Sequence, residues 1–359
     1  TEIPDYDFFS HNAFNHAKML ADIYFKNGYT DVEAKSGMHE GTYKVFVNFI
    51  PVADITQLNN QLFKAIKKEA IKIDQILYAP PNFLRMSMYL ELSRPAGDIS
   101  RWEKVLKRLT LLNKEYPIKV NCSEEKSQQK MINNENEKVI FNTLKKTFSE
   151  NKVVFFGNYA LFLYSQHKDG KHLMKSHSDF DVLANNPERI AHIVKDKLEE
   201  NGISKITIKK HKEIGEIIPM RYELKIGDDI VASIYKPIGC HSYNVITRGG
   251  IKLRIASIDT ILSFYLAFLY ANKPYYNACK NKLLCAAQML FDIQKENRLS
   301  QRGILKRFSI ICYGHQSTIE EARGVKAEKF NELRDKKGSK EYEMWFLNYK
   351  PCAAKNNNN

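Results

Sequence analysis

Two stretches decide the fold: residues 153–164 read VVFFGNYALFLY, and residues 179–183 read DFDVL. The first begins with a short, continuous apolar run, which is typical of a buried strand. Gly157-Asn158 ends this run, and Tyr159 to Tyr164 then has the composition of a helix. The second stretch is again strand-like and stops at Asn185-Asn186-Pro187. The order strand, glycine turn, helix, strand predicts a sheet that helices cover.

The residues that follow continue this alternation. Asn186 can cap and Pro187 can begin a helix over 188–201, which Gly202 ends. From Ser257 onward the chain is expected to be largely helical, starting with a capped apolar helix. Three further strands are expected between these helices, at 205–210, 220–226 and 230–235.

The preceding residues form a separate part of the chain. Residues 1–121 combine helical patterns with strand-like runs at 43–50 and 85–92, which predicts an N-terminal α+β domain. Residues 122–137 are polar and rich in Asn, Gln and Glu, as in a linker. The expected division then continues with a central domain over 138–248, a mostly helical C-terminal domain over 249–352 and a disordered tail at 353–359.

Composition limits the class of protein. A hydrophobic fraction of 43% over 359 residues excludes a disordered chain. The formal net charge of +14 favours a polyanionic partner such as nucleic acid, although such an excess can also serve solubility alone. No apolar run is long enough for a membrane span, and no signal peptide is visible, so neither membrane insertion nor secretion is expected. Six scattered cysteines without a C-x-x-C pair predict no zinc ribbon or disulfide framework and favour a reducing compartment.

The acidic pair in DFDVL is the first candidate for chemistry. Asp179 and Asp181 stand at i and i+2 of a strand, so both carboxylates lie on the same face. Two carboxylates this close repel each other unless a cation lies between them, and hard oxygen ligands suit Mg²⁺ with bound phosphate oxygens. The alternative is an exposed strand end whose carboxylates are solvated.

The glycine turn upstream adds a phosphate site. Gly157 and Asn158 close a strand and open a helix, where backbone N–H groups can hold a triphosphate. The combined pattern resembles the nucleotidyltransferase superfamily related to DNA polymerase β. Family members usually carry Gly-Gly or Gly-Ser at the turn and a shorter gap to the first Asp, so an unrelated α/β domain remains an alternative.

Longer segments are similar to the poly(A) polymerase catalytic subunits of large DNA viruses, especially those of giant viruses. They occur in the same order over nearly the whole chain and lie at 101–118, 231–244, 249–270, 307–318 and 344–351. The resemblance implies an α+β fold with a central nucleotidyltransferase domain. It also implies template-independent transfer of AMP from ATP to the 3′ end of RNA, in the virion or the host cytoplasm.

The resemblance assigns roles to individual residues. It implies that Asp179 and Asp181 hold two divalent ions, Mg²⁺ or Mn²⁺, and that Gly157 and Asn158 contact the nucleotide phosphates. Lys273 and Asn277 would also bind the nucleotide, although a solvated loop explains them as well. His177 and His241, with the basic groups at 101–108 and 302–307, are further candidates that ordinary surface or core positions also explain.

A third carboxylate is missing where the family normally has one, since Ser233 occupies that position. If residues 227–229 form a hairpin loop, Glu223 lies directly opposite Ser233 on the neighbouring strand. Glu223 could then act as the general base or a metal ligand. The alternative is that Glu223 only pairs with the surroundings of Lys225 or with water.

Other functions also fit these features. Another nucleotidyltransferase, either an RNA uridylyltransferase or a small-molecule transferase, would share the motif. A non-catalytic, RNA-binding pseudo-transferase would explain the missing Asp. ATP and an RNA 3′ end are the expected substrates; a homodimer would also fit, but no interface is legible in the sequence.

Overall fold

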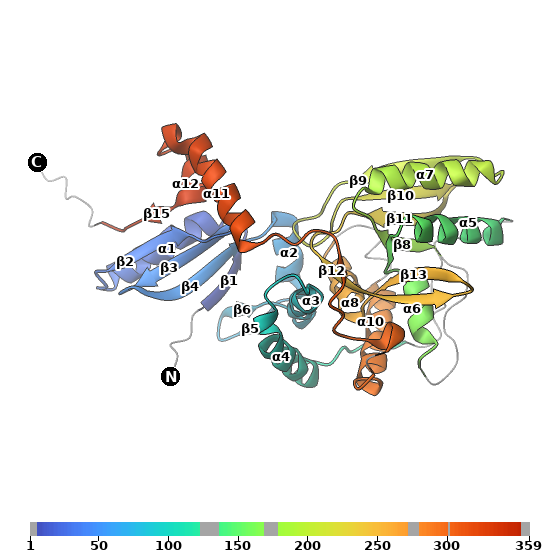
Figure 1. Ribbon diagram of the computed structural model, residues 1–359. Coiled ribbons are helices and arrows are strands. Elements are labelled where there is room, and N and C mark those ends of the chain that lie inside the picture. Colours follow the sequence, from blue (N-terminus) through green and yellow to red (C-terminus); the bar gives the residue numbers. More distant parts are fainter. Residues whose placement is uncertain (1–5, 123–135, 169–178, 272–279, 301, 353–359) are drawn as a thin grey trace, which may run out of the picture. The chain divides into compact units, whose positions relative to one another are not determined.

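The chain divides into two compact units in a computed structural model that describes residues 6–122, 136–168, 179–271, 280–300 and 302–352 (Figure 1). The first unit combines Thr1–Lys64 with Ser317–Asn359, and the second comprises Ala65–Gln316. The first unit is therefore built from both ends of the chain, and the second is contiguous in sequence.

The first unit is a five-stranded sheet with strand order β1-β4-β3-β2-β15. β1 runs parallel to β4, and the other neighbouring pairs are antiparallel. Its elements are β1 (Tyr6–Ser10), α1 (Ala13–Lys26), β2 (Val32–Ser36), β3 (Thr42–Val47), β4 (Ile50–Gln57), α2 (Asn60–Lys68, which crosses into the second unit), α11 (Ile319–Leu333), α12 (Lys340–Phe346) and β15 (Asn348–Tyr349).

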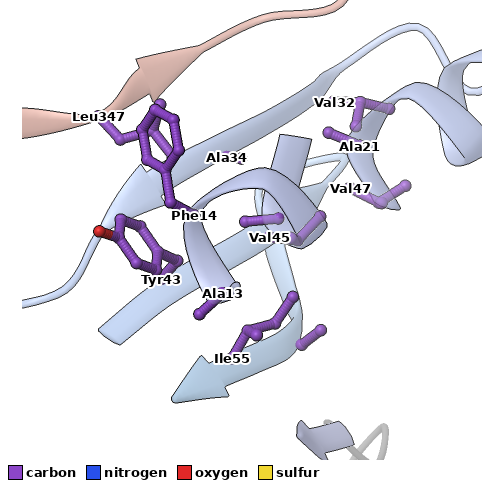
Figure 2. Packing of buried hydrophobic residues seen from close by; sticks show 12 residues of the cluster. Ala13, Phe14, Ala21, Val32, Ala34, Tyr43, Val45, Val47, Ile55 and Leu347 are labelled. Atoms are coloured by element: carbon purple, nitrogen blue, oxygen red, sulfur yellow. The ribbon is translucent and has the colours of Figure 1, made fainter. Parts of the chain in front are cut away.

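Alternation along β3 creates the core of this unit. Tyr43, Val45 and Val47 are buried, whereas the residues between them are partly exposed. Phe14 of α1 packs edge-on against Tyr43, with ring centroids 5.8 Å apart. Leu347, immediately before β15, joins the same cluster from the other end of the chain (Figure 2). The C-terminal segment is thus part of the core of the N-terminal sheet.

The second unit contains a mixed eight-stranded sheet with strand order β14-β12-β13-β7-β8-β11-β10-β9. Its strands are β7 (Val154–Phe155), β8 (Phe180–Leu183), β9 (Ile206–His211), β10 (Arg221–Ile226), β11 (Asp229–Tyr235), β12 (His241–Arg248), β13 (Ile251–Ala256) and β14 (Cys312–Tyr313). The other elements are the hairpin β5 (Ile71–Ile73) and β6 (Ile76–Tyr78), with α3 (Pro81–Leu92), α4 (Trp102–Glu115), α5 (Glu137–Glu150), α6 (Asn158–Ser165), α7 (Pro187–Glu200), α8 (Ile258–Phe268) and α10 (Lys280–Glu296).

Helices α5 and α7 pack on the eight-stranded sheet (Figure 1). Phe141 and Phe148 of α5 contact Phe180 of β8, with ring centroids 5.1 Å and 5.7 Å apart. Asn186 accepts a hydrogen bond from the Arg189 N–H at 3.0 Å and so caps α7, as the sequence predicted. Because Phe180 points toward α5, the flanking Asp179 and Asp181 point to the opposite side of β8.

Helix α8 is buried along its whole length and anchors the rest of the unit. Phe264 of α8 packs against Phe156, with ring centroids 4.7 Å apart, and Phe268 of the same helix packs against Tyr235 at the end of β11. Ser257 accepts a hydrogen bond from the Thr260 N–H, which confirms the predicted cap. Helix α3 packs along α8, and Phe83 of α3 meets Tyr270 at 5.5 Å.

The expectation of a strand at 85–92 was wrong, because these residues belong to helix α3. Phe83, Met86 and Tyr89 recur every three residues and are all buried. Pro81 stands at the start of the helix, where its missing N–H costs nothing. Over a stretch this short, the helical spacing of buried residues resembled the alternation of polar and apolar residues in a strand.

The two units do not follow the domain boundaries expected from the sequence. Residues 65–121 group with the second unit because α3 packs on α8. A boundary at residue 248 would cut the hairpin of β12 and β13, in which Arg248 pairs with Ile251. Residues 317–352 group with the first unit because β15 pairs with β2. Most of the expected linker and the whole expected tail lie outside the described residues.

Two disulfides, Cys122–Cys285 and Cys240–Cys312, contradict the expectation that the cysteines form none. The partners are 163 and 72 residues apart in sequence, so spacing alone could not reveal them. Cys240 leads into β12 and Cys312 lies on the neighbouring β14, so sheet pairing brings these two together. Within the described residues, no helix combines the length and apolarity needed to cross a membrane.

Replacing Leu347 by Ala tests whether the C-terminal segment completes the first unit. Leu347 is buried in the core of that unit, so its truncation should lower the free energy of unfolding by about 2–5 kcal/mol. Chemical denaturation followed by circular dichroism measures the loss. Val325→Ala on the exposed side of α11 is the control; an equal effect of both variants would contradict the assignment.

Candidate active site

The two carboxylates expected to carry the chemistry lie side by side at the start of β8. Asp179 directly precedes the strand, and Asp181 is its second residue. Both are largely removed from solvent, with exposed fractions of 0% and 7%. Buried carboxylates are costly unless partners compensate their charge. The alternative of a solvated strand end is therefore wrong.

The Gly157-Asn158 turn packs directly against these carboxylates. The backbone N–H groups of Phe156 and Gly157 donate to the Asp181 carbonyl oxygen at 3.0 Å and 3.2 Å. Asn158 begins helix α6, and its side-chain Nδ2 donates to Asp179 Oδ1 at 2.6 Å. The amino end of α6, with its unpaired N–H groups and positive dipole, thus adjoins both acids.

Position 157 requires glycine because a Cβ atom there would collide with Asp181, and not because the backbone adopts a positive φ angle. A Cβ at this position would lie 2.4 Å from Asp181 Oδ2 and 2.5 Å from Asp181 Cβ. Both distances are far below van der Waals contact. Any side chain at 157 would push the Asp181 carboxylate from its place, so this contact explains why position 157 is a glycine.

The register of the predicted hairpin is confirmed at Glu223. Glu223 pairs with Ser233, and Ser233 pairs with Asp181 on the parallel strand β8. The hairpin loop differs from the expected 227–229, since Ile226 pairs with Asp229. A bulge between Leu224 and Lys225 absorbs the difference and leaves Glu223 opposite Ser233. The Cα atoms of Glu223 and Asp181 are two strand spacings apart, about 10 Å.

Basic side chains surround the Glu223 carboxylate. It lies 3.5 Å from His211 Nε2, 3.9 Å from an Arg221 guanidinium nitrogen and 3.7 Å from Lys225 Nζ. Burial is the main cause that lowers the pKa of His211, and Arg221 lowers it further. Glu223 therefore adopts the ion-paired arrangement that was the alternative to a catalytic position.

Arg221 and His211 were missed by the sequence analysis. Arg221 alternates with Glu223 and Lys225 along β10, and His211 pairs with Arg221 across β9 and β10. The sequence did contain a signal for Arg221: Arg221, Glu223 and Lys225 are spaced two residues apart along β10, so their charged side chains lie on one face of the strand.

Of the remaining predicted residues, the structure describes His241 and Arg307, and both make other contacts. Lys273, Asn277 and His177 lie outside the described residues. His241 is fully buried against Phe264, and burial lowers its pKa to about 3, so it is a neutral core residue. Arg307 forms a buried ion pair with Asp259 at 3.1 Å.

Asp179 and Asp181 have the chemistry to hold a divalent cation. Their buried oxygens are hard ligands of the type that Mg²⁺ and Mn²⁺ prefer. Across the parts of the chain that the structure describes, no cluster of three or more His, Cys, Asp or Glu side chains could hold a metal. Among the described residues, Asp179 and Asp181 remain the candidate ligands, and phosphate oxygens are the donors that could complete such a set.

Comparison with known proteins finds a family model and viral relatives that resemble part of this chain. Residues 1–98 match the sequence model of the family described as poly(A) polymerase catalytic subunit. A stretch of 117 residues is 37% identical to a putative poly(A) polymerase catalytic subunit of Acanthamoeba polyphaga mimivirus, and covers 32% of this chain and 19% of that protein. A putative subunit from an African swine fever virus isolate from Kenya is 32% identical over 125 residues, which cover 33% of this chain and 26% of that protein.

A solved structure extends the likeness to nearly the whole chain. The Megavirus polyadenylate synthase superimposes with a TM-score of 0.76 at 20% identity, over 92% of this chain and 68% of that chain. At this identity the likeness concerns the fold. It confirms the expected α+β class, and together with the sequence matches it confirms the resemblance to viral poly(A) polymerase catalytic subunits.

Replacing Gly157 by Ala tests the contact between the turn and Asp181. The added methyl group overpacks a buried site, so the free energy of unfolding should fall by about 1–3 kcal/mol. Gly324→Ala is the control, because the helix position in α11 has open space for a Cβ and should gain about 0.5–1 kcal/mol. Equal stability changes in both variants, measured by chemical denaturation, would disprove the close contact.

Proposed function

We propose that this chain transfers AMP from ATP to the 3′-hydroxyl of RNA without a template. One observation carries the proposal: the amino end of α6, Asn158 and the two buried carboxylates meet in one strand–turn–helix–strand unit. This unit has the parts that phosphoryl-type transfer needs, since it offers N–H donors for phosphate beside acidic ligands for a cation. The likeness to viral poly(A) polymerase subunits supports the choice of ATP and RNA.

In the proposed reaction, the chain's own residues bind and orient the nucleotide. The first turn of α6 presents N–H groups to the triphosphate, and Gly157 at its start leaves room for the Asp181 carboxylate beside them. Asn158 holds Asp179 in place through its 2.6 Å hydrogen bond. The RNA 3′-hydroxyl oxygen forms a bond to the α-phosphorus of ATP, and the bond to the leaving pyrophosphate breaks.

Asp179 and Asp181 would hold the divalent cations, two ions of Mg²⁺ or Mn²⁺. Such ions activate an attacking hydroxyl and stabilise the charge on the leaving group. The burial of both carboxylates strengthens their attraction for a cation, because surrounding protein screens charge less than water does.

The partners and the compartment belong to the same proposal. The net charge of +14 supports RNA as the polymer substrate over a small molecule. We also propose that the protein acts in the virion or host cytoplasm and that it self-associates as a homodimer. The second candidate is a non-catalytic RNA-binding protein, which Ser233 beside Asp181 and the ion-paired Glu223 favour.

Asp179→Asn and Asp181→Asn test the active site. Each keeps the side chain's size but removes the charge that would hold a cation, so extension of a labelled oligoribonucleotide should fall by about 10³-fold or more, in line with the several kcal/mol of metal-assisted stabilisation. Binding of the RNA should remain nearly intact.

The assay supplies each of the four nucleoside triphosphates separately, with Mg²⁺ or Mn²⁺. Extension by ATP alone supports the proposal. Extension only by UTP would identify a uridylyltransferase, and absence of pyrophosphate release with any triphosphate would identify a non-catalytic protein. Substantial extension by the double variant would place the reaction at another site.

Glu223→Gln tests the third carboxylate. If Glu223 accepts the proton of the attacking hydroxyl, the rate of extension should fall by about 10²-fold or more, with RNA affinity unchanged. Glu213→Gln on the nearby exposed loop is the control. Near-normal turnover in Glu223→Gln would show that the site uses two carboxylates and that Glu223 serves only its ion pairs.

A further inference from the structure

A cationic surface on strands β9 and β10 lies on the same side of the sheet as the Asp181 carboxylate. We call it the β9–β10 face; it consists of Lys209 and His211 of β9 with Arg221 and Lys225 of β10. The strand register places it there. Asp181 pairs with Ser233, and Ser233 pairs with Glu223. Glu223 in turn pairs with Lys209. Paired residues on neighbouring strands point to the same side of a sheet, so this row of side chains runs from the candidate active site to the β9–β10 face.

The β9–β10 face is accessible from solvent. Lys209 is exposed, and the side chains of His211 and Lys225 are 26% and 34% exposed. Strand β9 is the outermost strand at its end of the described sheet. The next residue, Lys210, points to the other side of β9, where its Nζ lies 5.6 Å from the ring centroid of Tyr222. A polymer can therefore reach the β9–β10 face from the edge of the sheet.

Positive charge exceeds negative charge on this side of the two strands. The residues of β9 and β10 that point there are Thr207, Lys209, His211, Arg221, Glu223 and Lys225. They comprise three permanent cations, one acid and two uncharged or titratable groups. The Glu223 carboxylate lies 3.7 Å from Lys225 Nζ and 3.9 Å from an Arg221 nitrogen. Both distances exceed the length of a charge-assisted hydrogen bond, about 2.7–2.9 Å.

Lys209 contributes charge that Glu223 does not compensate by direct contact. Among the residues that the structure describes, the ion pairs of Glu223 are with His211, Arg221 and Lys225, and Lys209 forms none. Burial lowers the pKa of His211, and the positive charges of Arg221 and Lys209 lower it further. A group of cations with this excess attracts an anion, because the anion relieves their mutual repulsion.

We propose that the β9–β10 face binds the phosphodiester backbone of the RNA strand just upstream of its 3′ end. The inference rests on the proposed function, since it concerns the same substrate. Lysine and arginine side chains bind nucleic acid by neutralising its phosphates and releasing the counterions around them. Such contacts carry no sequence information, but they fix the position of the strand on the protein.

The order of the strands favours the RNA strand over the nucleotide. In the order β7-β8-β11-β10-β9, strand β7 lies on one side of β8, and the β9–β10 face lies on the other. Helix α6, whose amino end takes the triphosphate in the proposed function, begins directly after β7. In-line transfer requires the attacking and leaving oxygens on opposite sides of the phosphorus. Pyrophosphate would therefore leave on the α6 side, and the RNA 3′-hydroxyl would approach from the β9–β10 face.

The distance between the carboxylates and the β9–β10 face suits a short piece of RNA. Lys209 is three strands away from Asp181 in the register, which corresponds to about 14 Å between their Cα atoms. Stacked nucleotides of one strand are about 3.4 Å apart along the axis, so roughly four of them span this distance. The face would thus contact phosphates within the last few nucleotides of the substrate.

Lys209→Gln, alone and combined with Lys225→Gln, tests the β9–β10 face through RNA binding. A labelled single-stranded oligoribonucleotide is titrated in a series of salt concentrations, without ATP. Each phosphate contact contributes about 0.7 to the slope of log affinity against log salt. The slope should therefore lose about 0.7 in the single variant and about 1.4 in the double variant. At 0.1 M salt these losses correspond to roughly 5-fold and 25-fold weaker affinity.

The neighbouring lysine provides a matched control. Lys210→Gln removes the same charge from the adjacent position of the same strand, but from the opposite side of the sheet, and should leave the slope nearly unchanged. Lys209→Arg keeps the charge and should retain most of the slope. Thermal unfolding of all variants verifies that they are folded.

Several results would overturn the inference. An unchanged slope in the double variant, or an equal loss in Lys210→Gln, would show that the β9–β10 face makes no specific contact with RNA. In extension assays the KM for RNA should rise in Lys209→Gln and that for ATP should not; a rise for ATP alone would assign the face to the nucleotide. If RNA binds through this face but is never extended, the inference stands and the proposed function fails. If RNA is extended by ATP with the slope unchanged in the double variant, the proposed function stands and the inference fails.

Discussion

The candidate site depends on the approach of one turn to one strand. Two backbone N–H groups, from Phe156 and Gly157, meet the carbonyl oxygen of Asp181, and this fixes the distance between the end of β7 and the middle of β8. At that distance no atom fits between Gly157 and the Asp181 side chain. The glycine, the aspartate and the start of α6 are therefore a single geometric unit, and none can change without moving the others.

This unit also explains how two acids tolerate burial. The Asn158 amide donates to Asp179, and the dipole of α6 points its positive end toward both carboxylates. On the far side of the strand, Phe180 is packed among the rings of α5 and α6, which prevents β8 from shifting. The aromatic core thus holds the acids at fixed positions, as electrostatic catalysis requires.

Local signals in the sequence predicted the local structure well. The Asn186 cap, the Ser257 cap and the strands β9 to β11 each follow from residues within a few positions. The pairing of Glu223 with Ser233 was predicted from a hairpin loop at 227–229, and it occurs because a bulge compensates for the shorter loop. Asp179, Asp181, Gly157 and Asn158 were identified because they belong to one short motif. The partners of Glu223 were not, because His211 reaches it across a strand pairing that local patterns do not encode.

Features that depend on distant residues could not be predicted. Residues 85–92 were expected to form a strand, whereas they belong to helix α3, which packs against the sequence-distant helix α8. The disulfides join elements that only the sheet order brings together. The grouping of residues 317–352 with the N-terminal sheet rests on the short strand β15 and on Leu347, neither of which has a distinctive local pattern.

The pairing of β15 with β2 makes the first unit a nested arrangement, with the entire second unit inserted between its two segments. Asn348 pairs with Lys35, so closing this part of the sheet joins points that most of the chain separates. The entropy of closing such a loop grows only slowly with its length. The second unit is contiguous in sequence, so all of its residues leave the ribosome before residues 317–352, which the N-terminal sheet needs for strand β15. Vectorial synthesis would then complete the site-bearing unit before the unit in which the chain begins.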